Sequence, residues 1–328
     1  MPTSARLDGA VLALDIGGTQ VRSAVVDGDG HVLRAKRART PVRDGGRAIV
    51  GAGIDLLQAV RAEHASRIAG VGISSAGPVD PHRGWILDPP NLGPTFRDLP
   101  IADDVSAALS LPAFLDRDTQ LAALGEGAFG AAVGVRDFIY LTVSTGIGGA
   151  VVSDGRLLRG PDGTAGELGH VLIDRLVGPP CGCGVRGHLE AISSGSGIAR
   201  TARTVAAAGE SELLAELVAG EGPAFGALHV AAAEDAGDPV ASAIMADARD
   251  AFAQACVTFA DLFDPDLIVV GGSLAVGQGD RLLGPAREAV ATQAFSAPAH
   301  RARIVPAALG DDVSLIGAAV LVAERLAG

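Results

Sequence analysis

The 328-residue sequence predicts an α/β protein made of two lobes of similar design. At Val11–Asp27 an apolar run enters a glycine-rich turn and a strand-like run leaves it, as in a β-hairpin, and the pattern returns at 138–152. After each hairpin, segments with helical spacing of their apolar residues alternate with short apolar strands. Two hairpins that open equivalent series indicate a duplicated architecture, and the length suits two domains better than one.

The first lobe is expected to begin with three consecutive strands, because two glycine-containing turns separate three strand-like runs. The predicted elements are strands at 10–16, 20–27 and 30–37, a helix at 48–63, a strand at 68–74, a helix at 101–109, a strand at 113–115 and a helix at 119–130. The last helix follows Asp118, whose carboxylate can accept from the first backbone N–H groups as an N-cap.

The second lobe is expected to continue from its hairpin into a largely helical region. The predicted elements are strands at 138–143 and 149–152, helices at about 189–205, 211–219 and 239–263, a strand at 267–270, a helix at 281–293, a strand at 302–305 and a closing helix at 313–326. The helix at 239–263 has the clearest start, because Asp238 can cap it and Pro239 suits its first position.

The composition excludes several classes of function. The net charge of −12, with no basic cluster longer than Arg34–Arg39, argues against nucleic acid as a partner. No stretch of about eighteen apolar residues exists to span a bilayer, and no signal peptide precedes Val11, so we expect a soluble, cytoplasmic protein without a membrane partner. Three cysteines do not make a disulfide framework, and Cys256, in an apolar helix, is expected to be a core thiol. Lys36 is the only lysine, which rules out a Walker loop.

Three glycine-rich strand ends, in a fixed order along the chain, indicate a nucleotide site. In the first of them, glycines let backbone N–H groups approach a phosphate, Thr19 adds a hydroxyl donor and Asp15 can hold a hydrated Mg²⁺. Each motif alone is as well explained by a structural turn. Together they indicate that the hairpins contact the phosphates and the last strand end contacts adenosine, with the nucleotide between the lobes. The residues are Asp15, Gly17, Gly18 and Thr19 in the first hairpin, Thr145 and Gly146 in the second, and Gly271 and Gly272 after a buried strand.

Asp118 has two interpretations. It can be a helix cap, with Asp116 and Arg117 forming a local surface pair. In the functional interpretation, its carboxylate accepts a proton from a sugar hydroxyl while that oxygen attacks the γ-phosphate. The position alone favours a cap, whereas the glycine-rich strand ends favour phosphoryl transfer.

A cluster of nitrogen and sulfur ligands predicts a zinc site. Four such ligands are enough for a closed tetrahedral site, which would be structural and would stiffen the loop that carries Glu167 and Glu190. The alternative is an incidental Cys-Gly-Cys sequence beside surface histidines, but the glycines between the ligands favour a metal knuckle. The expected ligands are His170, Cys181, Cys183 and His188.

Seven short motifs of the chain occur together in one known family. They are Asp15-Ile-Gly-Gly-Thr19, Ser75-Ala-Gly-Pro78, Asp118-Thr-Gln-Leu-Ala-Ala-Leu-Gly-Glu126, Thr145-Gly-Ile-Gly-Gly149, Glu167-Leu-Gly-His170, Cys181-Gly-Cys-Gly184 and Asp266-Leu-Ile-Val-Val-Gly-Gly272. From Leu12 to Leu326 the chain therefore resembles the ROK family of bacterial sugar kinases and sugar-responsive repressors, within the hexokinase–actin ATPase superfamily. The resemblance implies a two-domain actin-like ATPase (ribonuclease H-like) fold with a cleft between duplicated lobes. The N-terminal lobe would span residues 1–117, completed by a C-terminal helix at about 312–328, and the C-terminal lobe 118–311.

The resemblance also assigns roles to individual residues. It implies a glucokinase-like enzyme that transfers a phosphoryl group from ATP to the 6-hydroxyl of a hexose, with Asp118 as general base, Mg²⁺, a structural Zn²⁺ and a homodimeric or homotetrameric assembly. His170 would bind zinc through one ring nitrogen and the sugar through the other. The residues implied in sugar binding are Gly77, Arg117, Asp118, Glu167, His170 and Glu190.

Three positions depart from the family pattern. His188 stands in place of a third zinc cysteine, Arg117 in place of the asparagine before the base, and Gln120 where asparagine is frequent. Because arginine donates but cannot accept, its donors would contact sugar hydroxyls or an acidic substituent, or Asp116 would turn the side chain aside. The sugar therefore stays open among glucose, fructose, mannose, allose, N-acetylglucosamine and N-acetylmannosamine. The alternative from another class is a non-catalytic sugar sensor or regulator, without the DNA-binding segment that family repressors carry before the first hairpin.

Overall fold

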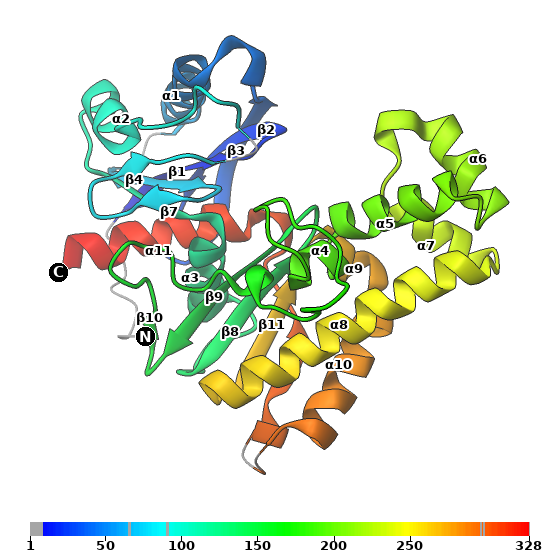
Figure 1. Cartoon of the computed structure of the whole chain (residues 1–328). Helices are drawn as coiled ribbons and strands as arrows, with labels where there is room; N and C mark the ends of the chain where they lie inside the picture. Colours follow the sequence, from blue (N-terminus) through cyan, green and yellow to red (C-terminus); the bar gives the residue numbers. More distant parts are fainter. Residues whose placement is uncertain (1–8, 65–66, 90–91, 296, 298, 328) are drawn as a thin grey trace. The chain divides into compact units, whose positions relative to one another are not determined.

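The computed structural model describes residues 9–64, 67–89, 92–295, 297 and 299–327, and two compact units divide the chain (Figure 1). Unit 1 comprises Met1–Arg136, Asp154–Ala165 and Ala308–Gly328, and unit 2 comprises Asp137–Ser153 and Gly166–Ala307. Each unit contains one main β-sheet with helices packed on it, so the expected α/β class is confirmed.

The sheet of unit 1 has the strand order β3-β2-β1-β4-β7. The first three strands form an antiparallel meander, while β4 and β7 run parallel to β1. The strands are β1 (Ala10–Ile16), β2 (Gln20–Val26), β3 (Val32–Arg39), β4 (Ile68–Ser75) and β7 (Ala113–Arg117), with the short strands β5 (Val79–Asp80), β6 (Trp85–Ile86) and β10 (Arg156–Leu157) elsewhere in the unit.

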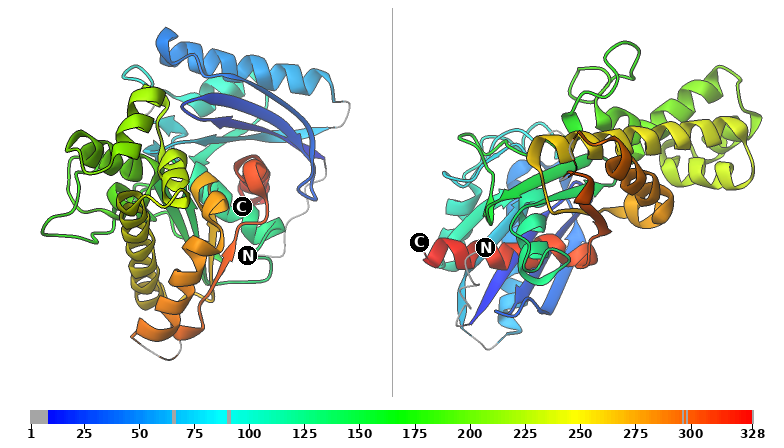
Figure 2. Two further views of the ribbon diagram at one scale, coloured as in Figure 1. Left: turned by 90° about the vertical axis from the view of Figure 1, so that its right-hand side faces the viewer. Right: turned by 90° about the horizontal axis from the view of Figure 1, so that it is seen from below.

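Helices cover both faces of this sheet, because side chains along β1 alternate between two apolar cores. Leu12 and Leu14 contribute to the core under α1 (Gly46–Ala62) and α2 (Ile101–Leu109), and Val11 and Ala13 to the core under α3 and α11. Figure 2 shows α1 and α11 on opposite faces of the sheet. The other helical segments of the unit are α3 (Asp118–Phe129), α11 (Val313–Ala327) and the single turns at Val42–Asp44 and Gly310–Asp312.

Two glycines bring α11 into close contact with the rest of unit 1. A Cβ on Gly72 of β4 would lie 2.3 Å from the carbonyl oxygen of Ala318, and one on Gly317 would lie 1.8 Å from that of Leu121 in α3. Only glycine permits such backbone approach. The helix at the end of the chain therefore belongs to unit 1.

The strands of unit 2 follow the order β9-β8-β11-β12, in which β11 is parallel to both its neighbours. The strands are β8 (Phe138–Val143), β9 (Ile147–Ser153), β11 (Leu267–Gly271) and β12 (Arg303–Pro306). The helices are α4 (Leu189–Ser193), α5 (Gly195–Ala207), α6 (Glu212–Glu221), α7 (Ala227–Asp235), α8 (Pro239–Phe263), α9 (Ser273–Gln278) and α10 (Asp280–Gln293), with single turns at Leu168–His170, Gly222–Ala224 and Ala299–Arg301.

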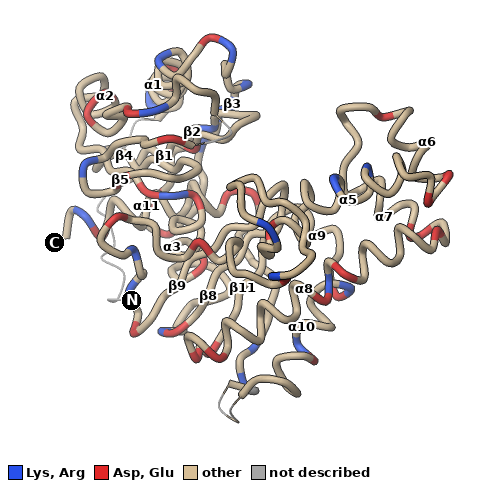
Figure 3. The backbone as a smooth tube through the Cα atoms, in the orientation of Figure 1, with Lys and Arg blue, Asp and Glu red and all other residues tan. Residues whose placement is uncertain are grey.

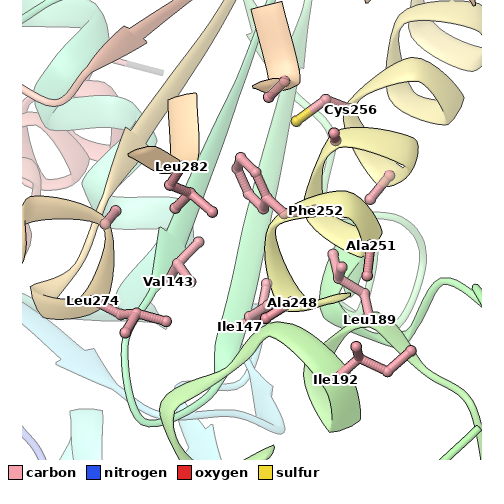
Figure 4. Close-up of a cluster of buried hydrophobic side chains, with 14 of the residues drawn as sticks. Val143, Ile147, Leu189, Ile192, Ala248, Ala251, Phe252, Cys256, Leu274 and Leu282 are labelled. Carbon is pink, nitrogen blue, oxygen red and sulfur yellow. The ribbon is translucent and has the colours of Figure 1, made fainter. Parts of the chain in front are cut away.

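The core of unit 2 lies between its sheet and α8. Phe252 and Cys256 of α8 point toward the strands, and Val143 and Ile147 of the β8–β9 hairpin face them (Figure 4). Cys256 is a fully buried free thiol, as expected, and burial raises its pKa. This core fixes the hairpin that carries Thr145 and Gly146.

Three features differ from the expected elements. The single helix predicted at 189–205 is two helices, because Ser194 has extended backbone and its hydroxyl accepts from Gly197 N–H as the N-cap of α5. Helices α7 and α9 were not predicted. Residues 118–136 and 154–165, which the family resemblance assigned to the C-terminal lobe, belong to unit 1, because Leu121 and Leu124 of α3 pack in the same core as α11. Among the described residues, no helix is both long and apolar enough to cross a membrane.

Candidate active site

The first glycine-rich turn joins β1 to β2 in unit 1. Gly17 N–H donates to the carbonyl of Gln20 (3.0 Å), which closes the turn and leaves Gly18 and Thr19 exposed. Thr40, which directly follows β3, makes two hydrogen bonds to this turn. Its hydroxyl donates to the carbonyl of Gly17 (2.6 Å), and its N–H donates to the carbonyl of Thr19 (3.0 Å). The turn thus presents its backbone and the Thr19 side chain in a fixed conformation.

Asp15, at the end of β1, accepts three hydrogen bonds from two side chains. Its Oδ1 accepts from the Ser74 hydroxyl (2.6 Å), and its Oδ2 accepts from Nη2 (2.7 Å) and Nε (3.1 Å) of Arg22. Arg22 is itself fixed by Nη1, which donates to the carbonyl of Asp311 (2.7 Å). The Asp15 side chain is 14% exposed. Oδ1 keeps a second lone pair, so a hydrated cation can still be bound through water.

The predicted phosphate turn and the predicted base lie at one edge of the sheet. Asp15 is paired in register with Ser74, and Ser74 with Asp116, while Ser75 is paired with Arg117. Because β1, β4 and β7 are parallel, these residues mark their carboxyl ends, which is where open α/β sheets bind ligands.

Asp118 is the first residue of α3, directly after β7. Arg117 occupies the N-cap position, so the prediction that Asp118 caps this helix is wrong by one residue. The Asp118 side chain is half-buried and its Oδ1 accepts from Thr119 N–H (2.7 Å). At the positive end of the helix dipole, the ionised carboxylate is stabilised.

Arg117 is buried, with 3% of its surface exposed. Its Nη2 donates to the carbonyl of Ala165, and when the Gln120 amide is oriented to satisfy both its ends, Gln120 Oε1 accepts from the same nitrogen at 2.8 Å. A Cβ on Gly77 would lie 2.9 Å from Arg117 Cδ. Asp116 is also fully buried. The surface pair considered from the sequence is therefore wrong, because neither residue is at the surface.

In unit 2, the second glycine-rich turn is bound to the start of α5. Ser144 N–H donates to Gly146 carbonyl (2.9 Å) within the turn. The carbonyls of Ser144 and Thr145 accept from the N–H groups of Gly195 (2.8 Å) and Ser196 (3.0 Å). The exposed Thr145 is thus held by a helix more than forty residues away, Gly195–Ala207.

The third glycine-rich strand end lies beside this turn. Gly271 is paired with Thr142 of β8, and Gly272 has a φ of +94° that favours glycine. A Cβ on Gly272 would lie 2.4 Å from Val143 carbonyl oxygen. The hydroxyls of Ser144 and Ser273 are 2.9 Å apart. The structure therefore brings together the two motifs that the sequence placed in this half of the chain.

Glu190 connects the hairpin to the cysteine-containing loop. Its Oε2 accepts from Ile147 N–H (3.0 Å), and its Oε1 accepts from the Cys181 thiol (3.7 Å). A Cβ on Gly146 would lie 2.5 Å from Glu190 Oε2. Glu167 is exposed, and its carbonyl accepts from His170 N–H (3.0 Å). Of the predicted sugar ligands in unit 2, Glu190 thus has both carboxylate oxygens in contact with the protein.

The four predicted zinc ligands converge on one point, since their ligand atoms all lie within 4.8 Å of one another. Cys183 Sγ is 3.3 Å from His188 Nδ1, and Cys181 Sγ is 4.0 Å from His170 Nδ1. Ligand atoms of a tetrahedral zinc stand about 3.3–3.8 Å apart, so the Cys183–His188 separation matches such a site and the Cys181–His170 separation is slightly wider. Burial raises the pKa of the Cys181 thiol, while burial and the neighbouring His170 lower the pKa of His188.

The backbone around the cysteines forms a tight turn. Gly184 N–H donates to Cys181 carbonyl (3.1 Å), and Cys181 N–H donates to Val185 carbonyl (2.7 Å). Gly187 has a φ of +78°, and a Cβ on it would lie 1.7 Å from Asp174 carbonyl oxygen. This turn aims both thiols to one side, as a metal knuckle requires.

The ROK family model matches residues 11–325 of the chain. The chain belongs to the ROK family. It is 33% identical over 319 residues to a glucokinase of Thermotoga maritima, covering 97% of this chain and 98% of the relative. It is 33% identical to an N-acetylmannosamine kinase of Escherichia coli O157:H7, covering 94% and 97%. The structure of a ROK family glucokinase from Streptomyces griseus, in complex with glucose and AMPPNP, aligns with a TM-score of 0.78 at 32% identity, covering 95% of this chain and 98% of that one.

As in ROK sugar kinases, the fold is that of an actin-like ATPase. Several residues around the site of this family member were not found by sequence reasoning. Thr40 supports the first turn, and Ser74 and Arg22 donate to Asp15. Arg159 donates to Asp116 from a distant part of the sequence. Ser74 carries a weak signal, since it ends an apolar strand, but nothing in the sequence marks Arg159.

Proposed function

We propose that this chain phosphorylates a hexose at its 6-hydroxyl with ATP, and that glucose is its preferred substrate. The chain is an ATP-dependent sugar kinase, in keeping with the glucokinases that match nearly its whole length. The observation that carries the proposal is the position of Asp118, half-buried at the N-terminus of α3 and on the sheet edge that bears the Gly17–Thr19 turn.

Asp118 is the proposed general base. One of its oxygens accepts from Thr119 N–H, which helps to orient the carboxylate that would accept the proton of the sugar hydroxyl. As the hydroxyl oxygen attacks the γ-phosphate, the proton passes to Asp118 and the leaving group is ADP. The helix dipole keeps the base ionised before the transfer.

The glycine-rich turns are the proposed nucleotide contacts. Backbone N–H groups at Gly17 to Thr19 and at Thr145 and Gly146 would face the phosphates, and Gly271 and Gly272 would let adenosine approach β11. Mg²⁺ would neutralise phosphate charge. Arg22 opposes direct binding of a cation to Asp15 Oδ2, so Asp15 would hold a metal-bound water through Oδ1.

The sugar is proposed to contact Gly77, Arg117, Glu167, His170 and Glu190. The Cys181–His188 turn, closed by zinc on its two thiolates and the imidazoles of His170 and His188, would fix the last two of these contacts. A site with four protein ligands has no open position, so the zinc would support structure and take no part in the transfer.

N-acetylmannosamine is the second candidate substrate. The Escherichia coli kinase for this amino sugar has the same 33% identity to the chain as the Thermotoga maritima glucokinase, over a slightly shorter alignment. Arg117, which replaces the family asparagine, alters the pocket at a position that contacts the sugar in the family.

A coupled assay of ADP release across a sugar panel tests the proposal. For each sugar, ADP release by the wild type is compared with ADP release by the Asp118→Asn variant. The panel contains glucose, mannose, fructose, allose, N-acetylglucosamine and N-acetylmannosamine. We expect the highest kcat/KM for glucose, and NMR of the product should place the phosphate on oxygen 6. A higher kcat/KM for N-acetylmannosamine supports the second candidate. Sugar binding without ADP release above the variant indicates a non-catalytic sensor instead.

A further inference from the structure

The segment from Arg159 to Ala165, here called the neck loop, closes on itself within unit 1. Ala165 N–H donates to the carbonyl of Arg159 (3.0 Å), so the two ends of the loop are hydrogen-bonded to each other. Between them, Gly160 and Gly163 have φ values of +72° and +71°, which turn the chain sharply. The next residue, Gly166, begins the part of the chain that belongs to unit 2, and Glu167 follows it.

The first end of the neck loop is held by a buried carboxylate. Asp116 is 0% exposed, and its Oδ2 accepts from Arg159 Nε at 2.8 Å. Its Oδ1 accepts from Arg117 N–H (2.9 Å) and, in the satisfied orientation of the amide, from Gln120 Nε2. A buried charge is retained only when it is paired and hydrogen-bonded in this way. The Arg159 side chain is 21% exposed, so this pair is largely screened from water.

The second end is held by the neighbouring residue of the same strand. Arg117 Nη2 donates to Ala165 carbonyl. Asp116 therefore contacts the first residue of the neck loop, Arg159, and Arg117 contacts its last residue, Ala165. Asp118, the proposed base, comes next in the chain. Asp116 and Arg117, the two residues before the base, thus hold the neck loop in place. Directly after this loop, at Gly166, the chain leaves unit 1 and enters the sequence that contains the proposed sugar-binding residues.

We infer that Asp116 and Arg159 form a positioning pair for the sugar substrate. Neither residue touches the reacting atoms. The pair holds the neck loop against the strand that carries the base, and so restricts where Glu167, two residues beyond the neck, can lie. The inference rests on the proposed function, because it assigns the pair to the sugar and not to ATP.

The pair is tested by Arg159→Gln, with Arg159→Lys as the conservative variant. In Arg159→Gln, we expect faster amide hydrogen exchange in peptides covering 159–165 without any ligand. We expect the KM for the sugar to rise about tenfold while kcat and the KM for ATP change less than about twofold, the pattern for loss of uniform sugar binding. Arg159→Lys, which keeps the charge, should recover part of both effects.

A second buried ion pair provides a matched control. In unit 2, Arg249 of α8 binds both carboxylate oxygens of Glu234 in α7 at 2.8 and 2.6 Å, with side chains 15% and 11% exposed. Figure 3 shows acidic and basic positions meeting beside α8 and α10 in this region. Arg249→Gln should lower the melting temperature but leave the sugar KM and the neck-loop exchange as in the wild type.

Three results would overturn the inference. They are unchanged neck-loop exchange in Arg159→Gln, an equal rise in sugar KM in Arg249→Gln, and a parallel change in the KM for ATP, which would indicate general damage. Failure of the proposed function is recognised separately. In that case the wild type releases no ADP with any sugar, and direct sugar binding, measured by calorimetry, takes the place of KM in the same comparison.

Discussion

Two carboxylates stand at the carboxyl edge of the first sheet, and their partners differ. Asp15 is paired with the guanidinium of Arg22 and accepts from Ser74, whereas Asp118 accepts from a backbone N–H at a helix start. Both oxygens of Asp15 are thus hydrogen-bonded to side chains of the first sheet, which fixes this carboxylate in place. The contrast supports assigning proton transfer to Asp118 and a supporting role to Asp15.

Asp118→Asn should abolish most turnover and leave the fold intact. An amide of the same shape can still accept from Thr119 N–H, but it cannot take the proton from the sugar hydroxyl. We expect kcat to fall by about 10²-fold or more, the scale of lost general-base catalysis, with sugar affinity by calorimetry unchanged. Turnover near that of the wild type would refute the assignment of the base.

Arg117→Asn should destabilise unit 1. The shorter side chain cannot reach the carbonyl of Ala165, which loses its donor. A hydrogen bond from a charged donor contributes about 1.5–3 kcal/mol, so we expect a loss of stability of this order, measurable as a lower urea midpoint. The matched control is Arg97→Asn, because Arg97 is 54% exposed and its nearest ion-pair distance is 3.4 Å. An equal effect in both variants would contradict the buried role of Arg117.

At the scale of elements, helix α8 shows which features local sequence can predict. Its bounds agree with the expectation from the sequence, because Asp238 caps it and Pro239 occupies its first turn. Asp238 Oδ1 accepts from Ala241 N–H (2.7 Å) and Oδ2 from the Ser211 hydroxyl (2.7 Å). Signals of this kind lie within a few residues of the element that they determine.

Asp238→Ala should lower the free energy of unfolding by about 1–2 kcal/mol at neutral pH, the typical value of an N-cap. Burial alone would raise the pKa of Asp238, but hydrogen bonds from Ser211 and from the N–H groups of Ala241 and Val240 lower it below its usual 3.8. A carboxyl group whose pKa is lower in the folded than in the unfolded protein stabilises the fold at any pH above its unfolded-state pKa. This stabilisation is lost as the pH falls through its folded-state pKa.

The difference in the free energy of unfolding between the wild type and Asp238→Ala should therefore be largest at pH 7 and decrease below about pH 4. Denaturant unfolding at pH 7 and pH 3.5 measures it, with Asp238→Asn as a capping control that does not titrate. A difference that is constant across this range would show that the charge of Asp238 does not contribute.

The elements that the sequence did not predict depend on distant partners. The break between α4 and α5 at Ser194 lets Gly195 N–H donate to the carbonyl of Ser144, which lies 51 residues earlier in the chain. Helix α9 is only six residues long and follows directly from the glycines that end β11. The candidate site residues were predicted because they lie in short motifs, whereas Arg159 and Thr40 act through contacts that no local pattern encodes.

At the scale of the whole molecule, the chain passes between the units after residues 136, 153, 165 and 307. Hydrophobic periodicity predicts elements but not which unit each one joins, and the single lobe boundary implied by the family resemblance could not place 154–165 in unit 1. The fold family was nevertheless predicted, because the motifs lie in both units and keep their order.

Removal of zinc should impair sugar binding more than nucleotide binding. Elemental analysis of the purified protein should find about one zinc per chain, as expected for four nitrogen and sulfur ligands. Chelation, or His188→Ala, should remove the metal and raise the KM for the sugar, because Glu190 follows His188 closely and contacts Cys181. His31→Ala, at a histidine 74% exposed, should retain the metal. Full activity in metal-free protein would rule out this role.

The packing of α11 on the first sheet has a consequence for biosynthesis. Val11, Ala13, Ala24 and Val26 form an apolar face that α3 and α11 cover, and α11 begins only at Val313. A ribosome adds roughly 5–20 residues per second, so this face waits roughly 15–60 seconds for its second helix after β1 is made. Unit 1 is thus the first unit to leave the ribosome and the last to be completed. During that interval the nascent chain exposes a surface that chaperones recognise, and a truncation before Val313 would make the exposure permanent.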